Sequence, residues 1–433
     1  MTFEKSFCPS PWFHMRITNS GTYEYCRWMS KKANVTRVNF AHSIQTESPI
    51  IYFQQTIAPI RKALLDGLTV PGCSDCLTME QHGKISGRQR QLLKVGVMTE
   101  YFEPSMASSP LLSDFDYSVD NHGHTLRTVT DWQIDLGNYC NGACIFCNPE
   151  SSSRLAAEFK QLGLTDRVPP PAWCDDPILL QQFIEDLKSS DNLQYLHFLG
   201  GETVITPGFK KILSALVEAD LARNITIGFT TNLTVWSDKV VALLKEFKQV
   251  NLGMSVEALT RVNDYVRYPS ELEKTRELLD QWRILGEECN WLMQLRITPT
   301  CLTVHDLSTV YEYAWQHNIA VESCNFLENP AFLRIGVLPL PQRQAAQDRL
   351  ESWLADHSVA RQDQIVNTRD PNQARAQIYQ DALSYLDYLT TVPDESSRLP
   401  ALITYLKQLE GSRNNSILTY IPEYEELFRS AGY

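Results

Sequence analysis

The amino-acid sequence predicts an α/β protein whose parallel sheet curls into an open or complete barrel. Six strand-like apolar runs alternate with helical patterns between residues 130 and 335. Strands that alternate with helices pair in parallel through right-handed crossovers. A Cys-rich segment precedes this region and helical periodicity follows it, so the sequence also predicts additions on either side of the barrel.

The predicted strands and helices follow one another along the barrel region. The six strands lie within WQIDL, LQYLHFLG, NITIGFTTN, QVNLGMSVE, WLMQLRITPT and AVESCNFLE. Candidate helices lie near residues 151–163, 208–222, 237–247, 270–286 and 303–317. Active sites in such folds lie at the C-terminal ends of the strands, so functional side chains are expected there.

Four regions are predicted along the 433 residues: an N-terminal Cys-rich module, a linker, the barrel and a C-terminal helical region. Their boundaries are 1–100, 101–129, 130–335 and 336–433. Beyond residue 340, apolar residues recur at spacings of three and four, which is typical of one buried helix face. RLPALITYLKQLEG has a proline near its start and Gly411 just after its end, as expected of a helix.

Composition excludes several classes of protein. With 43% hydrophobic residues and a mean hydropathy of -0.26, the chain should fold as a soluble globular protein. No apolar run approaches the length of a membrane span and no signal-peptide pattern is present, so the expected location is the cytoplasm. The net charge of -12 argues against general nucleic-acid binding. Eleven cysteines in a reducing compartment suggest metal or redox chemistry more than disulfides.

Three cysteines stand close together directly after the first predicted strand. Cys140, Cys144 and Cys147 have the spacing C-x3-C-x2-C. Soft thiolates at this density suit an iron–sulfur cluster or zinc. Three ligands on a four-iron cluster would leave one iron open, and an open metal position is typical of reactive sites. The spacing alone leaves two alternatives, a zinc site with a remote fourth ligand and unrelated buried cysteines.

A second motif ends the next predicted strand. Gly200 and Gly201 would let the backbone approach a ligand closely, and Glu202 supplies an acceptor for an ammonium group. Together with the cysteine triplet, this motif resembles the radical S-adenosylmethionine (SAM) superfamily. The resemblance covers roughly residues 130 to 330. It implies a partial (β/α)6 TIM-like barrel of the radical SAM type.

The resemblance also implies roles for individual residues. The three loop cysteines correspond to ligands of a [4Fe-4S] cluster whose fourth iron is chelated by SAM. Further expected SAM contacts are Phe146 near the adenine, Gly200, Gly201 and Glu202 at the amino group, and Asn232, Ser255 and Glu257 at the ribose and methionine. Arg267 resembles an arginine that neutralises the SAM carboxylate, a task suited to a guanidinium fork. An exposed helix arginine is the alternative for Arg267, and Thr203 replaces a proline that often follows the glycine motif.

The N-terminal region holds a second set of thiols, Cys8, Cys26, Cys73 and Cys76. Four thiols can close a tetrahedral zinc site or fill every corner of a [4Fe-4S] cluster. Beside the barrel, the set resembles the twitch module, the shorter relative of the SPASM extension, which implies an auxiliary [4Fe-4S] cluster. In the better-known enzymes this module follows the barrel, whereas here it precedes it. The other cysteines, Cys174, Cys289, Cys301 and Cys324, are expected to be small buried hydrophobes, with Cys324 also a candidate radical quencher or substrate contact.

Three functions are considered. The resemblance implies an enzyme, an oxidoreductase or peptide maturase, that reductively cleaves SAM to a 5′-deoxyadenosyl radical and abstracts hydrogen from a substrate. The first hypothesis is oxidative modification or crosslinking of a ribosomally made peptide or protein. The second is the same chemistry on a carbohydrate, amino acid or other small metabolite, and the third is a non-enzymatic zinc or iron–sulfur protein. Expected partners are an electron donor such as flavodoxin or ferredoxin and the substrate, with no membrane and no nucleic acid.

Overall fold

The computed structural model of the chain describes residues 6–29, 42–81, 86–96, 111–322, 327–357 and 371–433. The chain divides into two compact units, each built from several segments. The first unit comprises Met1–Gly137, Pro170–Gly228 and Lys239–Lys248, and the second comprises Asn138–Pro169, Phe229–Asp238 and Gln249–Tyr433. Among the helices within the described ranges, none is both long enough and apolar enough to cross a membrane.

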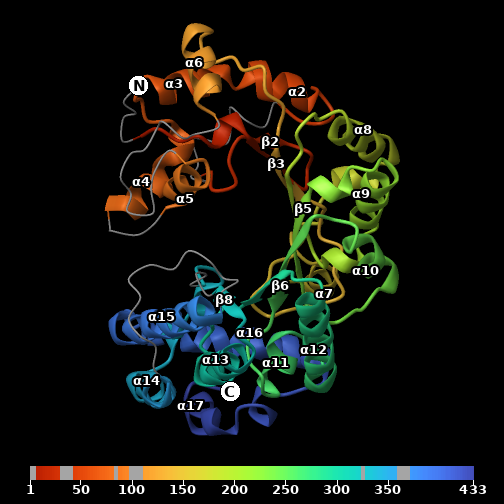
Figure 1. The fold of residues 1–433 in the computed structure, drawn as a ribbon. Coiled ribbons are helices and arrows are strands. Elements are labelled where there is room, and N and C mark those ends of the chain that lie inside the picture. Colours follow the sequence, from red (N-terminus) through yellow and green to blue (C-terminus); the bar gives the residue numbers. More distant parts are fainter. Residues whose placement is uncertain (1–5, 30–41, 82–85, 97–110, 323–326, 358–370) are drawn as a thin grey trace. The chain divides into compact units, whose positions relative to one another are not determined.

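Eight strands form a largely parallel sheet in the order β2-β1-β3-β4-β5-β6-β7-β8 (Figure 1). The strands are β1 (His14–Ile17), β2 (Tyr23–Glu24), β3 (Asp131–Asp135), β4 (Tyr195–Leu199), β5 (Thr226–Thr231), β6 (Gln249–Ser255), β7 (Leu292–Arg296) and β8 (Ala320–Glu322). In the first unit β3 pairs in parallel with β4, and in the second unit β6 and β8 pair in parallel with β7. The predicted α/β class is confirmed, and each of the six predicted strand segments contains a strand.

The sheet also includes two strands that the sequence pattern did not predict. β1 pairs in parallel with β3, and β2 pairs antiparallel with β1. Both strands lie in the N-terminal Cys-rich region, which the sequence predicted to be a separate module. β1 is only four residues long and its partner lies more than a hundred residues further along the chain, so no local periodicity announces the pairing. The predicted domain boundaries themselves stay a prediction.

Helices make up most of the remaining described chain. Those of the first unit are α2 (Pro49–Ile51), α3 (Ala58–Leu65), α4 (Ser74–Gln81), α5 (Gly87–Lys94), α6 (Leu112–Asp120), α8 (Pro177–Lys188) and α9 (Pro207–Glu218). Those of the second unit are α7 (Ser153–Gln161), α11 (Val262–Val266), α12 (Leu272–Glu288), α13 (Leu307–His317), α14 (Leu340–Asp356), α15 (Pro371–Thr391), α16 (Leu399–Arg413) and α17 (Glu425–Ser430). β5 and α10 (Asp238–Leu244) contain residues of both units.

The sheet of the first unit has an apolar and a polar face. Two aligned rows illustrate this, with Met15, Trp132 and Leu196 in one and His14, Asp131 and Tyr195 in the next. Side chains alternate along a strand, so the two rows point to opposite faces. Trp132 packs edge-on against Phe183 of α8, with ring centroids 5.1 Å apart, so α8 covers the apolar face. α8 is absent from the predicted helices, although its Asp176-Pro177 start is a strong helix signal.

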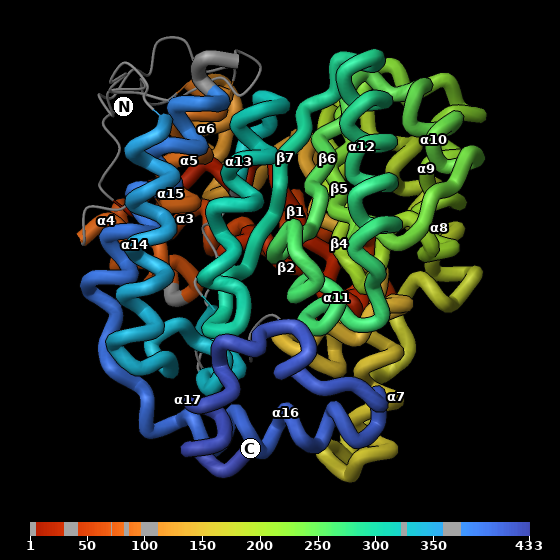
Figure 2. The backbone as a smooth tube through the Cα atoms, turned by 90° about the horizontal axis from the view of Figure 1, so that it is seen from below, coloured from red at the N-terminus to blue at the C-terminus, as the bar shows by residue number. Residues whose placement is uncertain are grey.

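In the second unit, helices pack closely on the strands and on one another. An added Cβ at Gly286 of α12 would clash with the sulfur of Met293 on β7, so this glycine permits the close approach. The buried residues of α12 recur at helical spacing, as the apolar stripe of a core-facing helix does. Helices α13, α14 and α15 lie side by side (Figure 2). The apolar stripes predicted beyond residue 340 therefore belong to packed helices.

Candidate functional site

The loop that carries the three neighbouring cysteines leads from β3 into α7. The first turn of α7 holds this loop. Ser152 caps the helix by accepting the Leu155 N–H at 3.1 Å, and its hydroxyl donates to the Gly142 carbonyl. The hydroxyl of Ser153 accepts the Cys140 N–H at 3.2 Å. The serines that start the helix therefore also fix the backbone around the first cysteine.

The three loop thiols lie close enough that ionisation of one would disfavour ionisation of the next. All three are partly exposed. An added Cβ at Gly142 would lie 3.7 Å from the Sγ of both Cys140 and Cys144, so this glycine leaves room between two sulfurs. Burial raises the pKa of Cys147 to about 12, and negative charge on Cys144 and Cys140 adds to the effect. A metal cluster would relieve this repulsion because it binds thiolates, so the donor set fits an iron–sulfur cluster.

Arg267 stands beside the second cysteine and is held by a carboxylate. Its Nε and Nη2 donate to Oε1 of Glu257 at 3.1 and 2.8 Å, and its Nη1 lies 3.9 Å from the Sγ of Cys144. Its guanidinium carbon lies 5.5 Å from the ring centroid of Phe146. Burial opposes the charge of Arg267, but Glu257 and Cys144 outweigh it and raise the pKa of the arginine. The Arg267 side chain is 10% exposed, so Arg267 is a largely enclosed charged group rather than an exposed helix arginine.

Glu257 is enclosed by protein groups. Its side chain is 1% exposed, and one of its oxygens accepts both Arg267 bonds. Its other oxygen accepts the backbone N–H of Thr298, and its own N–H donates to Oδ1 of Asn263 at 3.0 Å. This arrangement orients the guanidinium of Arg267.

Asn232 and Ser255 are the remaining predicted SAM contacts of the second unit. Asn232 donates to Oδ1 of Asn141 at 2.9 Å, and its Nδ2 lies 4.0 Å from the Sγ of Cys140. Its Oδ1 accepts the Thr234 N–H at 3.2 Å. Ser255 is partly exposed and ends β6. Sequence reasoning missed Asn141, although its position inside the cysteine triplet was a usable clue.

The glycine motif, Gly200, Gly201 and Glu202, lies in the first unit. An added Cβ at Gly200 would lie 3.1 Å from the Gly137 carbonyl oxygen, which explains why a residue without a side chain stands at this position. Glu202 is 1% exposed, and its side chain caps the turn that follows β4 by accepting the Val204 N–H at 3.1 Å. The hydroxyl of Thr206 donates to the Glu202 carbonyl at 2.8 Å. The predicted contacts of Gly200, Gly201 and Glu202 with SAM stay predictions.

The four N-terminal thiols influence one another electrostatically. Burial raises the pKa of Cys8 well above its usual value, and charge on Cys26, Cys73 and Cys76 raises it further. Burial likewise raises the pKa of Cys26 to about 12 and that of Cys73 to about 11. These thiols come from three separate segments of the chain, so the fold of the first unit brings them together. Within the described ranges, no group of three or more His, Cys, Asp or Glu side chains is arranged to hold a single metal ion.

For the remaining cysteines, the prediction of burial is confirmed at Cys174 and Cys301 and is wrong at Cys289. Cys174 and Cys301 are 8% and 0% exposed, and the thiol of Cys174 lies 3.4 Å from the Leu136 carbonyl oxygen. Cys289 is partly exposed. Cys324 lies outside the described residues.

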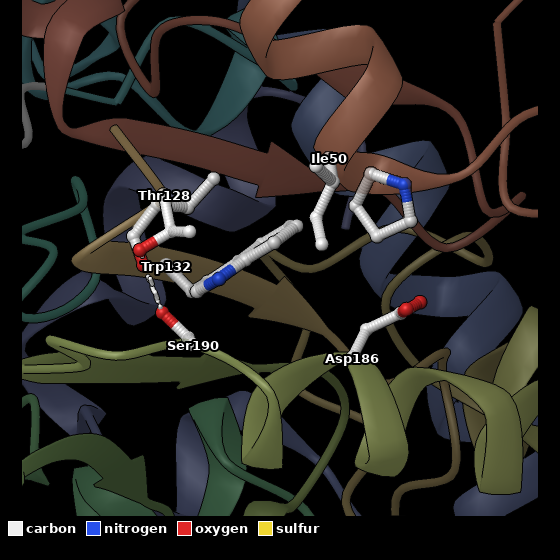
Figure 3. Close-up of a pocket in the computed structure, with 7 residues that line it drawn as sticks. Ile50, Thr128, Trp132, Asp186 and Ser190 are labelled. Carbon is white, nitrogen blue, oxygen red and sulfur yellow. Dashed lines mark hydrogen bonds between the residues drawn. The ribbon is translucent and has the colours of Figure 1, made fainter. Parts of the chain in front are cut away.

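Two hollows of the first unit lie away from the C-terminal ends of the strands. One is bordered by Pro49, Ile50, Thr128, Val129, Trp132, Asp186 and Ser190 and encloses about 20 Å³, which is room for about one water (Figure 3). Burial raises the pKa of Asp186 there to about 6. The other is larger and polar, and it lies at the N-terminal ends of β4 and β5. Ligands of parallel α/β sheets bind at the opposite, C-terminal strand ends, so neither hollow is assigned to substrate.

Part of the sequence matches one family model. Residues 134–290 match the model described as the Radical SAM superfamily, somewhat more than a third of the chain. The matched segment contains the three loop cysteines, the glycine motif and Arg267. None of the curated proteins matches the chain.

Several solved structures resemble this fold distantly. Streptococcus suis SuiB bound to precursor peptide SuiA is 15% identical with a TM-score of 0.35, over 66% of this chain and 60% of that one. Native anSMEcpe with bound AdoMet is 15% identical with a TM-score of 0.36, over 52% and 60%. The radical S-adenosylmethionine methyltransferase TsrM from Kitasatospora setae is 13% identical with a TM-score of 0.32, over 44% and 35%. The chain thus spans about 60% of the length of the first two, and scores this low carry no argument about activity or substrate.

Proposed function

We propose that this chain, which is a radical SAM superfamily enzyme, holds a [4Fe-4S] cluster on Cys140, Cys144 and Cys147 and binds SAM beside it. One observation carries the proposal. In the second unit, three neighbouring thiols and a largely enclosed guanidinium lie together on and beside one short loop. A three-thiol set leaves one iron of a four-iron cluster for another ligand, and a fixed cation suits the carboxylate end of an amino acid.

The chain's own residues would bind and orient the cofactors. Arg267 would neutralise the SAM carboxylate, with Glu257 holding the guanidinium fork in place. Phe146, whose ring faces the same guanidinium, would lie near the adenine. Asn232 and Ser255 would contact the ribose or methionine, and the motif Gly200, Gly201 and Glu202 would bind the amino group. The predicted (β/α)6 barrel would place these residues at the C-terminal ends of its strands.

When bound, the cluster and SAM supply a 5′-deoxyadenosyl radical that can take a hydrogen atom from an unactivated carbon. The protein's part is to exclude water and hold the substrate carbon in reach, because a primary radical attacks whatever lies nearest. The four N-terminal thiols, brought together by the fold of the first unit, would hold an auxiliary cluster. A fully ligated auxiliary cluster suits electron transfer, which favours a net oxidation of the substrate.

We infer a peptide or protein as the substrate, with an oxidative modification or crosslink as the product. The alternative is the same chemistry on a carbohydrate, an amino acid or another small metabolite. In either case a fully ligated auxiliary cluster on the four N-terminal thiols would serve as the electron acceptor. A non-enzymatic metal protein is not proposed further, because the family match identifies an enzyme.

Anaerobic reconstitution tests the proposal. The wild-type chain should bind about eight irons, as two four-iron clusters do, and form 5′-deoxyadenosine with dithionite and SAM. Replacing Cys140, Cys144 and Cys147 together by Ala should abolish the nucleoside. Continued SAM cleavage by this triple variant would refute the assignment.

A further inference from the structure

We propose that α16, which lies outside the matched segment, positions the cluster-binding loop through Arg413 and Tyr405. Nη2 of Arg413 donates to the Ala143 carbonyl at 2.8 Å, and the hydroxyl of Tyr405 donates to the Ile145 carbonyl at 2.8 Å. These two carbonyls belong to the residues on either side of Cys144. The inference rests on the proposed function, because it assigns a task at the same cluster site.

The backbone N–H groups of Ala143 and Ile145 are hydrogen-bonded as well. The N–H of Ala143 donates to the Tyr268 carbonyl at 2.7 Å, and the N–H of Ile145 donates to the Val266 carbonyl at 2.9 Å. Both residues that flank Cys144 therefore have their donor and their acceptor bound to protein. Cys144 is held from two sides, with the segment that carries Arg267 on one and α16 on the other.

Arg413 is too deeply buried to be an incidental surface contact. Its side chain is 2% exposed, and Glu158 of α7 accepts from its Nε and Nη2 at 2.8 and 2.6 Å. Its guanidinium carbon also lies 4.6 Å from the ring centroid of Tyr268. Burial favours the neutral form of Glu158, but hydrogen bonds from Arg413 and Ser412 outweigh it and lower the pKa of the carboxyl. A buried charge needs a partner of opposite charge. The Arg413–Glu158 ion pair links α16 to α7, and the same arginine also bonds the cysteine loop.

The hydrogen bonds would also act electrostatically on a cluster bound by the loop. The Ala143 carbonyl shares its peptide group with the N–H of Cys144. A carbonyl that accepts from a cation becomes more polar and strengthens its peptide N–H as a donor. Hydrogen bonds and charge near the sulfurs set the reduction potential of a cluster. Positive charge stabilises the more negative, reduced form, so loss of Arg413 should make the potential more negative.

The test uses the full chain with Cys73 and Cys76 replaced by Ala, so that only the loop cluster is measured. In this background Arg413→Gln, Arg413→Lys and Tyr405→Phe are compared with Lys407→Gln. Lys407 also lies on α16, but it donates to the Gly432 carbonyl at the exposed C-terminus. Iron retention under a chelator series, the electron paramagnetic resonance spectrum and the midpoint potential are recorded, and circular dichroism checks the fold.

Arg413→Gln should lower the chelator concentration that removes half of the iron by roughly tenfold, as loss of an outer hydrogen-bond partner does at metal sites. It should also shift the potential in the negative direction. Arg413→Lys should recover part of both effects, Tyr405→Phe should show a smaller loss of retention, and Lys407→Gln should match the background protein.

Three results would count against the inference. If the background protein holds iron, and Arg413→Gln keeps the same iron retention and potential, α16 does not position the loop, while the proposed function stands. If the background protein takes up no iron at the loop, the proposed function fails and this inference fails with it. Should Arg413→Gln not fold, Tyr405→Phe decides, because it removes one hydroxyl group only, and unchanged retention and potential would then count against the inference.

Discussion

The two thiol sets of this chain are built in different ways. Cys140, Cys144 and Cys147 come from one eight-residue stretch whose backbone is fixed by hydrogen bonds on both edges. The N-terminal set comes from three separate segments, and two of its members are buried. The charge of Arg267 opposes the rise in the pKa of Cys144, whereas burial and thiol–thiol repulsion dominate at Cys8.

A local sequence motif brings the loop thiols together, whereas the tertiary fold brings the N-terminal thiols together. The loop thiols stay partly exposed and have a cation beside them, which suits a cluster that meets a soluble cofactor. The N-terminal thiols number four and are more enclosed, which suits a cluster with every corner ligated. The following changes should separate the two roles.

The largest effect is expected from Cys144→Ala. With one of three ligands gone, the loop cluster should not form, and 5′-deoxyadenosine formation should fall to background. Iron should drop from about eight to about four per chain. Iron and sulfide assays together with nucleoside chromatography measure both. A variant that keeps eight irons and wild-type nucleoside formation would remove the distinction between the sets.

The converse change is Cys73→Ala with Cys76→Ala. Iron should again fall to about four, but SAM cleavage without product should persist, because the loop cluster stays intact. The same chromatography reports the nucleoside, and the electron paramagnetic resonance spectrum reports which cluster is left. Complete loss of SAM cleavage in a folded variant would mean that the N-terminal set acts in the first step and not after it.

A smaller effect is expected from Arg267→Ala. This change leaves the buried Glu257 carboxylate without its ion-pair partner, which typically costs about 3–5 kcal/mol of unfolding free energy. Urea unfolding of the cluster-free protein measures it. Adding Glu257→Gln should restore much of the loss, because the remaining group is then uncharged. An Arg267→Ala protein of wild-type stability would show that the pair is not formed in solution.

The smallest expected effect is a dependence of folding stability on pH, caused by His14 of the first unit. Arg27, which follows Cys26, donates to Asp131 at 2.9 Å, and His14 bonds the same carboxylate at 3.0 Å. Burial lowers the pKa of His14 from 6.5 to about 4 against the opposing effect of Asp131. The unfolded chain therefore binds more protons than the folded chain between these two pH values, so stability falls as pH decreases through that window.

Urea midpoints at pH 7 and pH 5 measure this dependence. The wild-type chain should lose more stability between the two than His14→Gln, which cannot take up the proton. Equal losses in the two proteins would show that His14 is not buried in its neutral form.

Local patterns predicted much of this molecule. Six strands of the sheet follow from short apolar runs, and C-x3-C-x2-C identifies the loop because all three cysteines lie within eight residues. Contacts between distant segments were missed. Tyr405 and Arg413 form hydrogen bonds with residues 260 and 270 positions away in the sequence. The helical pattern of α16 does not distinguish these two residues from their neighbours. The pairing of β1 with β3 was missed for the same reason, since its four residues acquire their role only from a remote partner.

The most direct test of the central claim is the spectrum of the loop cluster alone. In the reduced protein with Cys73 and Cys76 replaced by Ala, adding SAM should change the electron paramagnetic resonance signal, because an iron with no protein ligand is free to bind it. A signal from about four irons that stays the same with and without SAM would contradict the account.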